Sequence, residues 1–232
     1  MHIFYAPDIT SSQELPEGEA KHATQVLRLK EGDSITITNG LGFFYEATII
    51  TATKKKCRVR IDKTTEVQKP FSCSLHLAMA PTKLMERTEW LAEKATEIGI
   101  DEISFLNTQF SERRTIKLER IEKKVISAAK QSLKAYLPQI NELISFTDFI
   151  KQEFNGQKFI AHCYPTEKKL LKSVLLPNID TLILIGPEGD FSESEVEMAV
   201  EKGFIPITLG EARLRTETAA LVAVHTFTLI NQ

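Results

Sequence analysis

The stretch TLILIGPEGDFSESE, residues 181–195, decides the fold class of this chain. Five apolar or β-branched residues predict a buried strand, Gly-Pro-Glu-Gly predicts a tight turn, and a serine followed three residues later by a glutamate predicts a helix start. Many α/β proteins hold a nucleotide on a strand, a glycine turn and a helix. This turn, however, matches neither G-x-G-x-x-G nor G-x-x-x-x-G-K-[ST]. The stretch therefore predicts an α/β fold and a turn built for some other ligand.

The charge at this turn narrows the ligand class. A phosphate site would be expected to carry lysine or arginine here, because cations stabilise phosphate. Instead, Glu188 and Asp190 put negative charge beside the turn. Acidic side chains disfavour a phosphate and tolerate a cation. This counts against one alternative, a nucleotide-using α/β enzyme of another type.

The residues around the turn continue the alternation of strands and helices. We expect strands at 73–80, 102–106, 158–163, 182–185 and 205–209, and helices at 82–99, 117–133, 166–176 and 192–202. Such alternation predicts a mostly parallel sheet covered on both faces, with ligands bound at the carboxyl ends of its strands.

A second strand, glycine and helix pattern follows in LGEARLRTETAALVA, residues 209–223. Thr216 is able to cap this helix. Two glycine loops at strand ends are expected to form two walls of one pocket. The only arginines near it are Arg213 and Arg215, and Arg213 alone would indicate no more than a surface ion pair.

The first part of the chain has a different pattern. Short strands are expected at HIFY, 34–38, 44–53 and 57–62, with one helix at 17–29. This arrangement suggests a small β-barrel, a fold that often binds nucleic acid. A polar stretch ends at Pro70, so we expect two domains, 1–69 and 70–232.

Composition excludes several classes of protein. The 232 residues carry a formal net charge of −2, and no run of about 18 apolar residues or secretory leader is present. Three widely spaced cysteines argue against a disulfide framework and a zinc site, and the scattered histidines suggest no metal. We therefore expect a cytoplasmic protein without membrane association or metal.

Two local features point to partners. Residues 108–134 contain eight Lys or Arg against three Glu, and a second basic cluster lies at 54–63. Basic clusters are most often solvated faces, but two in one chain favour RNA binding.

The last helix, 217–230, has almost no polar face. It is covered either by a second subunit or, as a central helix, by the rest of the monomer.

Several motifs resemble one family in order along the chain. They are residues 26–33, 94–99, 111–113, 131–132, 185–192, 209–210 and 214–219. Together they resemble the RsmE family of SPOUT-class methyltransferases, which methylate N3 of a uridine in 16S ribosomal RNA. The chain departs from the family pattern at Asp190, where a second glycine is usual, and at Ala212, Arg213, Lys130 and Lys134.

The resemblance implies a fold that periodicity alone does not. It implies a C-terminal SPOUT domain with a deep trefoil knot, an N-terminal PUA-like domain, a homodimer with the last helix in the interface, and S-adenosylmethionine as the cofactor. The implied cofactor-binding residues are Leu184, Ile185, Gly186, Glu188, Gly189, Leu209, Gly210, Leu214, Arg215, Thr216, Thr218 and Ala219.

The implied reaction assigns roles to two further positions. Uridine N3 carries a proton at neutral pH, so we expect Arg215 to stabilise the anion that forms when the proton leaves. Glu217 either orients Arg215, acts as the general base, or is a first-turn glutamate favoured by the helix dipole.

The resemblance also implies 16S ribosomal RNA or the small ribosomal subunit as the partner. The expected phosphate contacts are Arg28, Lys30, Lys54, Lys55, Lys56, Arg58, Arg113 and Arg114. His22 is expected to be structural or a minor RNA contact. The alternative is a non-catalytic RNA-binding factor of ribosome assembly, which would need the same basic clusters.

Overall fold

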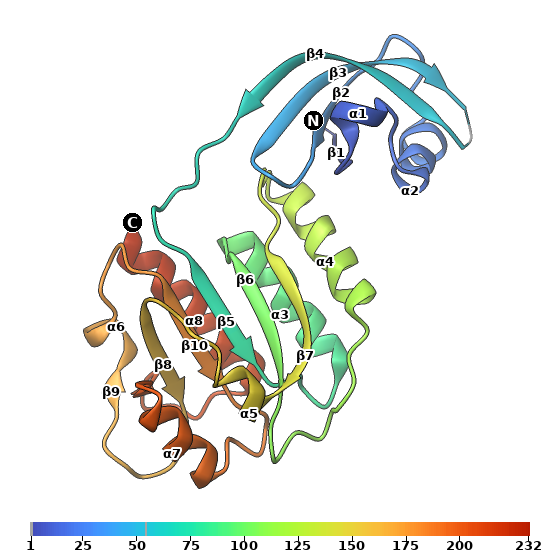
Figure 1. The fold of residues 1–232 in the computed structure, drawn as a ribbon. Coiled ribbons are helices and arrows are strands. Elements are labelled where there is room, and N and C mark those ends of the chain that lie inside the picture. Colours follow the sequence, from blue (N-terminus) through green and yellow to red (C-terminus); the bar gives the residue numbers. More distant parts are fainter. Residues whose placement is uncertain (1, 54) are drawn as a thin grey trace. The chain divides into compact units, whose positions relative to one another are not determined.

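The computed structural model of the chain describes residues 2–53 and 55–232 (Figure 1). It divides into two compact units, Met1–Pro70 with Ile126–Leu137, and Phe71–Val125 with Pro138–Gln232. The first break follows Pro70, next to the boundary expected from the polar stretch. The helical pattern of α4 (Leu118–Gln131) runs without interruption across the second break, so the sequence pattern does not indicate it.

The first unit is built on a four-stranded sheet of order β1-β2-β3-β4. Its strands are β1 (Ile3–Tyr5), β2 (Ser34–Thr38), β3 (Phe43–Ala52) and β4 (Cys57–Glu66). β1 pairs parallel with β2, while β2 with β3 and β3 with β4 are antiparallel. The four strands expected from the sequence are all present.

Helical residues cover one face of this sheet. The short helix α1 (Ile9–Ser12) precedes α2 (Glu17–Lys21), which continues as a π-helical segment, η1 (His22–Val26). The expected helix at 17–29 is therefore confirmed through Val26, with its second part π-helical, and is wrong only for residues 27–29. After Val26 the chain turns sharply, because Arg28 adopts a left-handed conformation with φ of 57°.

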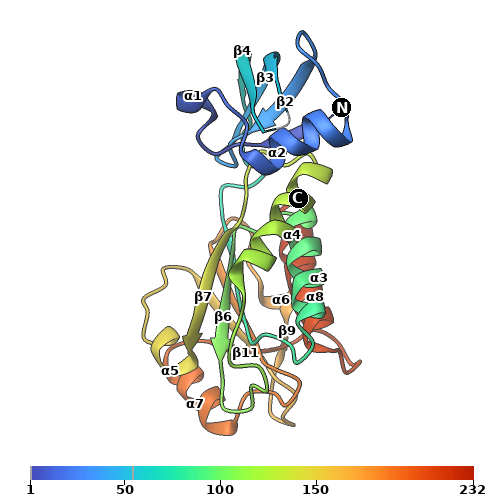
Figure 2. The ribbon, with the colours of Figure 1, turned by 90° about the vertical axis from the view of Figure 1, so that its right-hand side faces the viewer.

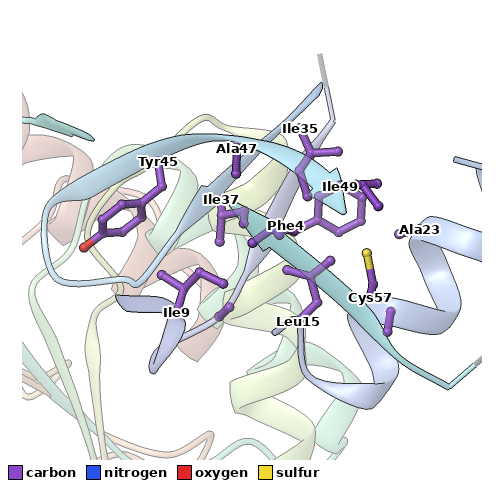
Figure 3. Packing of buried hydrophobic residues seen from close by; sticks show 13 residues of the cluster. Phe4, Ile9, Leu15, Ala23, Ile35, Ile37, Tyr45, Ala47, Ile49 and Cys57 are labelled. Atoms are coloured by element: carbon purple, nitrogen blue, oxygen red, sulfur yellow. The ribbon is translucent and has the colours of Figure 1, made fainter. Parts of the chain in front are cut away.

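The core of the first unit follows from the alternation of its strands. Every second residue of β3 from Tyr45 to Ile49 is buried, which places Tyr45, Ala47 and Ile49 on the face that meets Phe4 and Ile37 (Figure 3). Cys57 lies in the same core as a free thiol, and burial raises its pKa. Cys73 is also buried and free, whereas Cys163 is exposed.

The segment Ile126–Leu137 completes the first unit. The amide of Gly42 donates to the carbonyl of Ala135 at 2.9 Å, and the amide of Leu137 donates to the carbonyl of Gly40 at 2.9 Å. Lys130 Nζ forms an ion pair with Glu19 Oε1 at 2.6 Å, and both side chains are mostly buried. The two backbone bonds satisfy groups at the turn between β2 and β3, and the ion pair joins α4 to α2, so the unit needs both parts of the chain.

The second unit is built on a seven-stranded sheet of order β7-β6-β5-β10-β8-β11-β9. The strands are β5 (Leu75–Met79), β6 (Glu102–Asn107), β7 (Gln139–Ser145), β8 (Gln157–Ala161), β9 (Lys169–Leu170), β10 (Thr181–Ile185) and β11 (Ile205–Thr208). Neighbouring strands pair parallel. All five residues of β10 are buried, as expected of a central strand in a covered parallel sheet.

Helices cover both faces of this sheet. On one face, α3 (Met85–Ile98) and α8 (Thr216–Asn231) lie side by side (Figures 1 and 2). On the other face lie α5 (Phe146–Phe149) and α7 (Glu193–Glu201). Phe146 and Phe191 contact each other there, with 5.5 Å between ring centroids. The predicted parallel α/β architecture is confirmed.

The helix expected at 166–176 is wrong over most of its length. The structure has strand β9 at Lys169–Leu170 and only the short helix α6 (Leu171–Val174). Lys169 and Leu170 pair with Ile207 and Thr208 of β11. Tertiary pairing therefore overrides the local helix propensity of this lysine- and leucine-rich stretch.

The helix start expected in the opening stretch is confirmed in detail. The Ser192 hydroxyl accepts from the amide of Glu195, and Glu195 Oε2 accepts from the amide of Ser192 at 2.8 Å. Glu195 Oε1 also accepts from the amide of Gln109 at 2.9 Å. One buried carboxylate thus caps α7 and fastens the loop after β6 to it.

We expect Glu195→Ala to destabilise the protein by about 1–3 kcal/mol, because it removes the acceptor of the buried Ser192 amide and that of the part-buried Gln109 amide. Urea unfolding at neutral pH measures the change. Glu193→Ala is the matched control, since Glu193 is an exposed first-turn residue of the same helix. Equal destabilisation by the two changes would contradict this account.

Candidate active site

A cavity of about 650 Å³ lies at the carboxyl ends of β8, β10 and β11. Both glycine loops predicted from the sequence contribute to it. The lining residues are Ala161, His162, Cys163, Lys168, Ile185, Gly186, Pro187, Glu188, Asp190, Ile207, Thr208, Leu209, Gly210, Glu211, Ala212, Arg213, Leu214, Arg215, Thr216 and Ala219. The structure therefore brings the two loops together as walls of one cavity.

Most of the predicted cofactor-binding positions meet at this cavity. They are Ile185, Gly186, Glu188, Leu209, Gly210, Leu214, Arg215, Thr216 and Ala219. Three others, Leu184, Gly189 and Thr218, are not among its lining residues in the part of the chain that the structure describes. A Cβ atom at Gly189 would meet Phe110 at 3.0 Å, so this glycine permits contact with a neighbouring loop.

The two remaining loop glycines have separate reasons to lack a side chain. A Cβ atom at Gly186 would lie 3.0 Å from the backbone nitrogen of Phe191 and 3.1 Å from the carbonyl carbon of Asp190. Gly210 has a φ of 141°, a conformation that residues with a Cβ rarely adopt. Both positions therefore require glycine for the loops to take this shape.

The acidic residues of the first loop bind backbone amides. Glu188 Oε1 accepts from the amide of Lys83 at 3.0 Å. Asp190 has a left-handed φ of 67°, and its carboxylate accepts from the amides of Cys163 at 2.6 Å and Phe191 at 2.8 Å. These carboxylates brace the loop, which adds a structural role to the electrostatic one inferred from the sequence.

Sequence reasoning missed the wall that follows β8. This wall contains His162, Cys163 and Lys168, and Lys168 Nζ donates to the carbonyls of His162 at 3.0 Å and Tyr164 at 2.6 Å. With Lys168, three basic and three acidic side chains line the cavity, so its charge is more balanced than the first loop alone suggests. No motif marks this segment, and only its position after a central parallel strand could have indicated it.

His162 is the most deeply buried polar side chain of this wall. It is 6% exposed, and neither ring nitrogen has a hydrogen-bond partner among residues 2–53 and 55–232. Desolvation lowers its pKa, and the positive charge of Lys168 lowers it further, although Asp190 opposes the shift. The ring is therefore a neutral imidazole at neutral pH.

This burial predicts a pH dependence of stability. A histidine with a pKa below its unfolded value of about 6.5 binds fewer protons in the folded state, so the free energy of unfolding falls as the pH drops below that value. We expect His162→Gln to lose less stability than the wild type between pH 7.5 and 5.5 in urea unfolding. His76, whose pKa is also lowered by burial, retains its own dependence in both proteins. His2→Gln, at an exposed position, is the control, and identical pH profiles for wild type and His162→Gln would contradict the prediction.

The two predicted catalytic residues lie in different surroundings. Arg215 is exposed, lines the cavity and occupies the N-cap position of α8. The expected cap, Thr216, is instead the first residue of the helix, a correction to the sequence prediction. Glu217 is 7% exposed, does not line the cavity among the described residues, and lies 3.7 Å from Arg87 Nε of α3. Within a single chain, therefore, Arg215 lies at the cavity and Glu217 does not.

The predicted RNA-contacting residues fall in both units. In the first unit, Arg28 and Lys30 line a second cavity of about 640 Å³, and Lys55, Lys56 and Arg58 are exposed. Lys54 lies outside the described residues. His22 is exposed and contacts the Phe4 ring edge-on, with 6.1 Å between centroids. These placements leave the basic side chains of this unit accessible to a polyanion.

The second unit holds the other two predicted RNA contacts. Arg114 is exposed, whereas Arg113 is engaged within the protein. Its Nη2 donates to the carbonyl of Lys83 at 2.6 Å, and its Nε donates to the carbonyl of Thr82 at 3.1 Å. Arg113 therefore fixes the loop before α3 in addition to any contact with RNA.

Neither a metal site nor a membrane span is found in the described chain. Residues 2–53 and 55–232 contain no group of three or more His, Cys, Asp or Glu side chains arranged to hold a metal ion. Within the same residues, every helix is too short or too polar to cross a lipid bilayer.

Two known domain families match this chain. The RNA methyltransferase domain family matches residues 69–228, and the RNA methyltransferase PUA domain family matches residues 15–62. The fold and the cavity thus define an RNA methyltransferase with an N-terminal PUA domain. A curated relative from Rickettsia conorii, named ribosomal RNA small subunit methyltransferase E, is 34% identical over 86% of this chain and 82% of its own. The chain belongs to this family of small-subunit ribosomal RNA methyltransferases.

Solved structures agree with this membership. A probable rRNA methyltransferase from Porphyromonas gingivalis is 45% identical, with a TM-score of 0.94 over 100% of this chain and 98% of that chain. A ribosomal RNA small subunit methyltransferase E from Neisseria gonorrhoeae, bound to S-adenosylmethionine, is 26% identical, with a TM-score of 0.88 over the same shares. The family and the SPOUT and PUA-like fold class predicted from the sequence are confirmed, and the trefoil knot stays a prediction.

Proposed function

We propose that this protein transfers a methyl group from S-adenosylmethionine to N3 of a uridine in 16S ribosomal RNA of the small subunit. The observation that carries the proposal is the cavity at the carboxyl ends of β8, β10 and β11, where both glycine loops and Arg215 converge. The relatives' names support the RNA class, and the Neisseria structure supports the cofactor. The choice of N3 rests on the family resemblance in the motifs.

The residues of the cavity fit S-adenosylmethionine. The cavity volume of about 650 Å³ is in the range of sites for ligands of this size. The mixed acidic and basic lining suits a ligand with a carboxylate, an ammonium and a sulfonium group. When bound, the cofactor supplies an activated methyl group on its sulfonium. The backbone of the Gly186 and Gly210 loops and the side chains after β8 are the groups that would hold it.

Arg215 is the residue that we assign to the chemical step. Its position at the N-cap of α8 puts a permanent positive charge at the mouth of the cavity. A guanidinium beside O2 or O4 of uracil would favour the anion formed when N3 loses its proton. Glu217 reaches Arg87 within one chain, so we assign it first to holding α8 against α3. Its role as a general base stays a prediction.

We also propose that the protein acts as a homodimer. The helices α3 and α8 leave large apolar side chains exposed, with Trp90 at 42% and Leu229 at 56%. A second copy of the chain would cover them, which agrees with the apolar character of α8. Sedimentation equilibrium at micromolar concentration tests this, and a single-chain mass would contradict it.

We propose that the basic residues of both units bind the phosphates of ribosomal RNA, and that the protein acts in the cytoplasm. Phosphate contacts make affinity fall steeply with salt and carry no sequence information. The alternative, a non-catalytic assembly factor, shares this salt dependence and predicts no affinity for S-adenosylmethionine.

Two measurements test the proposed function. Isothermal titration of the purified protein with S-adenosylmethionine should give saturable binding. If titration gives no heat and the cofactor does not shift the thermal unfolding midpoint, the non-catalytic assembly factor is the better supported function. Mass spectrometry of small-subunit RNA from cells lacking the protein should show one uridine without its N3 methyl group. An unchanged modification pattern would overturn the proposed reaction even if the cofactor binds.

A further inference from the structure

Asp190 occupies a backbone position that ordinarily favours glycine. Its φ of 67° lies in the left-handed region, where residues other than glycine, asparagine and aspartate are rare. It is also the position in the first loop where the chain departs from the family pattern, which usually has glycine. A glycine would adopt this conformation without strain. An interaction of the Asp190 carboxylate must therefore stabilise the structure enough to offset the backbone strain.

The carboxylate of Asp190 makes two short hydrogen bonds, and one of them joins two walls of the cavity. Asp190 Oδ1 accepts from the amide of Phe191, the next residue of its own loop, at 2.8 Å. Asp190 Oδ2 accepts from the amide of Cys163, in the segment after β8, at 2.6 Å. Hydrogen bonds to an ionised carboxylate are stronger than those between neutral groups. The side chain therefore holds the segment after β8 against the loop after β10.

Neighbouring contacts reinforce the same junction. The Tyr164 hydroxyl donates to the carbonyl of Phe191 at 2.8 Å, and Lys168 Nζ donates to the carbonyls of His162 and Tyr164. Of the side chains at this junction, Asp190 alone lines the cavity, occupies the first loop and binds the backbone of the second wall. The wall that it holds carries His162, whose imidazole nitrogens lack partners among the described residues.

We propose that Asp190 is a positioning residue that preorganises the cofactor cavity by fixing the segment 162–164 to the Gly186–Gly189 turn. The inference rests on the proposed function, because the ligand it concerns is S-adenosylmethionine. Asp190 acts through the backbone of Cys163 and through the wall that carries His162. Without the carboxylate, the segment after β8 samples more conformations, and binding has to order it.

Three substitutions separate the carboxylate from the backbone. Asp190→Gly removes the carboxylate and relieves the left-handed strain but adds backbone freedom, so the loss of affinity that it shares with Asp190→Ala belongs to the missing hydrogen bonds. Asp190→Asn tolerates the same φ and retains one acceptor oxygen. Asp190→Ala removes the carboxylate and leaves the strain. Glu193→Gln is the matched control, because Glu193 is an exposed acidic residue nearby on α7 that does not line the cavity among the described residues.

Isothermal titration with S-adenosylmethionine measures the effect directly. We expect Asp190→Gly to bind about tenfold more weakly than the wild type, Asp190→Asn to recover part of the loss, and Glu193→Gln to bind as the wild type does. In methylation assays, Asp190→Gly should raise the KM for the cofactor and leave kcat nearly unchanged, because Arg215 is untouched. Circular dichroism and thermal unfolding confirm that each variant is folded.

Hydrogen exchange tests the geometry without reference to activity. The Cys163 amide should exchange faster in Asp190→Gly than in the wild type, while amides in the middle of β8 keep their protection. Wild-type affinity together with wild-type protection of Cys163 in Asp190→Gly would overturn the inference. Failure of the wild type itself to bind S-adenosylmethionine would instead overturn the proposed function, so the two failures are distinguishable.

Discussion

Arg215→Ala is expected to lower kcat for methyl transfer by about 10²–10³-fold, the usual loss when one group that stabilises a developing anion is removed. Arg215 is exposed and lines the cavity at the N-cap of α8, so its side chain can meet the base without any rearrangement of the core. Single-turnover methylation of small-subunit RNA with saturating cofactor measures the chemical step.

The accompanying changes distinguish catalysis from binding. Affinity for S-adenosylmethionine should change by less than about tenfold, because backbone groups of two glycine loops remain in place. Arg215→Lys should lie between wild type and Arg215→Ala, since it keeps the charge and loses the planar fork of the guanidinium. A kcat for Arg215→Ala within threefold of the wild type would remove Arg215 from the chemical step.

Gly186→Val is expected to abolish measurable binding of S-adenosylmethionine. The first added atom would lie 3.0 Å from the backbone nitrogen of Phe191 and 3.1 Å from its ring, and Phe191 is fully buried. Neither the backbone nor the packed ring can yield cheaply, so the loop must shift, at a cost of about 1–3 kcal/mol. Isothermal titration measures binding, and thermal unfolding should show a lower midpoint for the same reason.

Two other glycines provide controls for this prediction. Gly18→Ala in α2 meets no atom within 4 Å, so it should leave binding and stability unaffected or slightly raise stability. A Cβ atom at Gly189 would face Phe110, so we expect Gly189→Val to lose less affinity than Gly186→Val. Wild-type affinity in Gly186→Val would show that the loop after β10 is not part of the site.

The sequence predicts most of the fold because its signals are local. The β10 strand, the tight turn and the Ser192 to Glu195 cap follow one another in 15 residues, and the structure has each of them. Position after a central strand also predicts the edge of the sheet where the cavity lies.

The parts that the sequence did not predict depend on contacts distant in the chain. Strand β9 exists because Lys169 and Leu170 pair with β11, nearly 40 residues later. In the sequence, Asp190 is only a negative charge beside the turn. Its hydrogen bond from the Cys163 amide exists because the sheet brings the two residues together. The burial of Glu217 against Arg87 likewise follows from the packing of α8 on α3. In each case the partner, and not the residue itself, determines the role.

The division of the first unit into Met1–Pro70 and Ile126–Leu137 has a consequence for how such a protein can be rearranged. An RNA-binding module joined at one point can be gained or lost by a single fusion. Here the amide of Leu137 and the carbonyl of Ala135 supply bonds to the β2–β3 turn. A fragment ending at residue 70 would therefore lack part of its own structure, and an exchange of modules between relatives has to preserve two junctions at once. The two units are expected to have evolved, and are best expressed, as one chain.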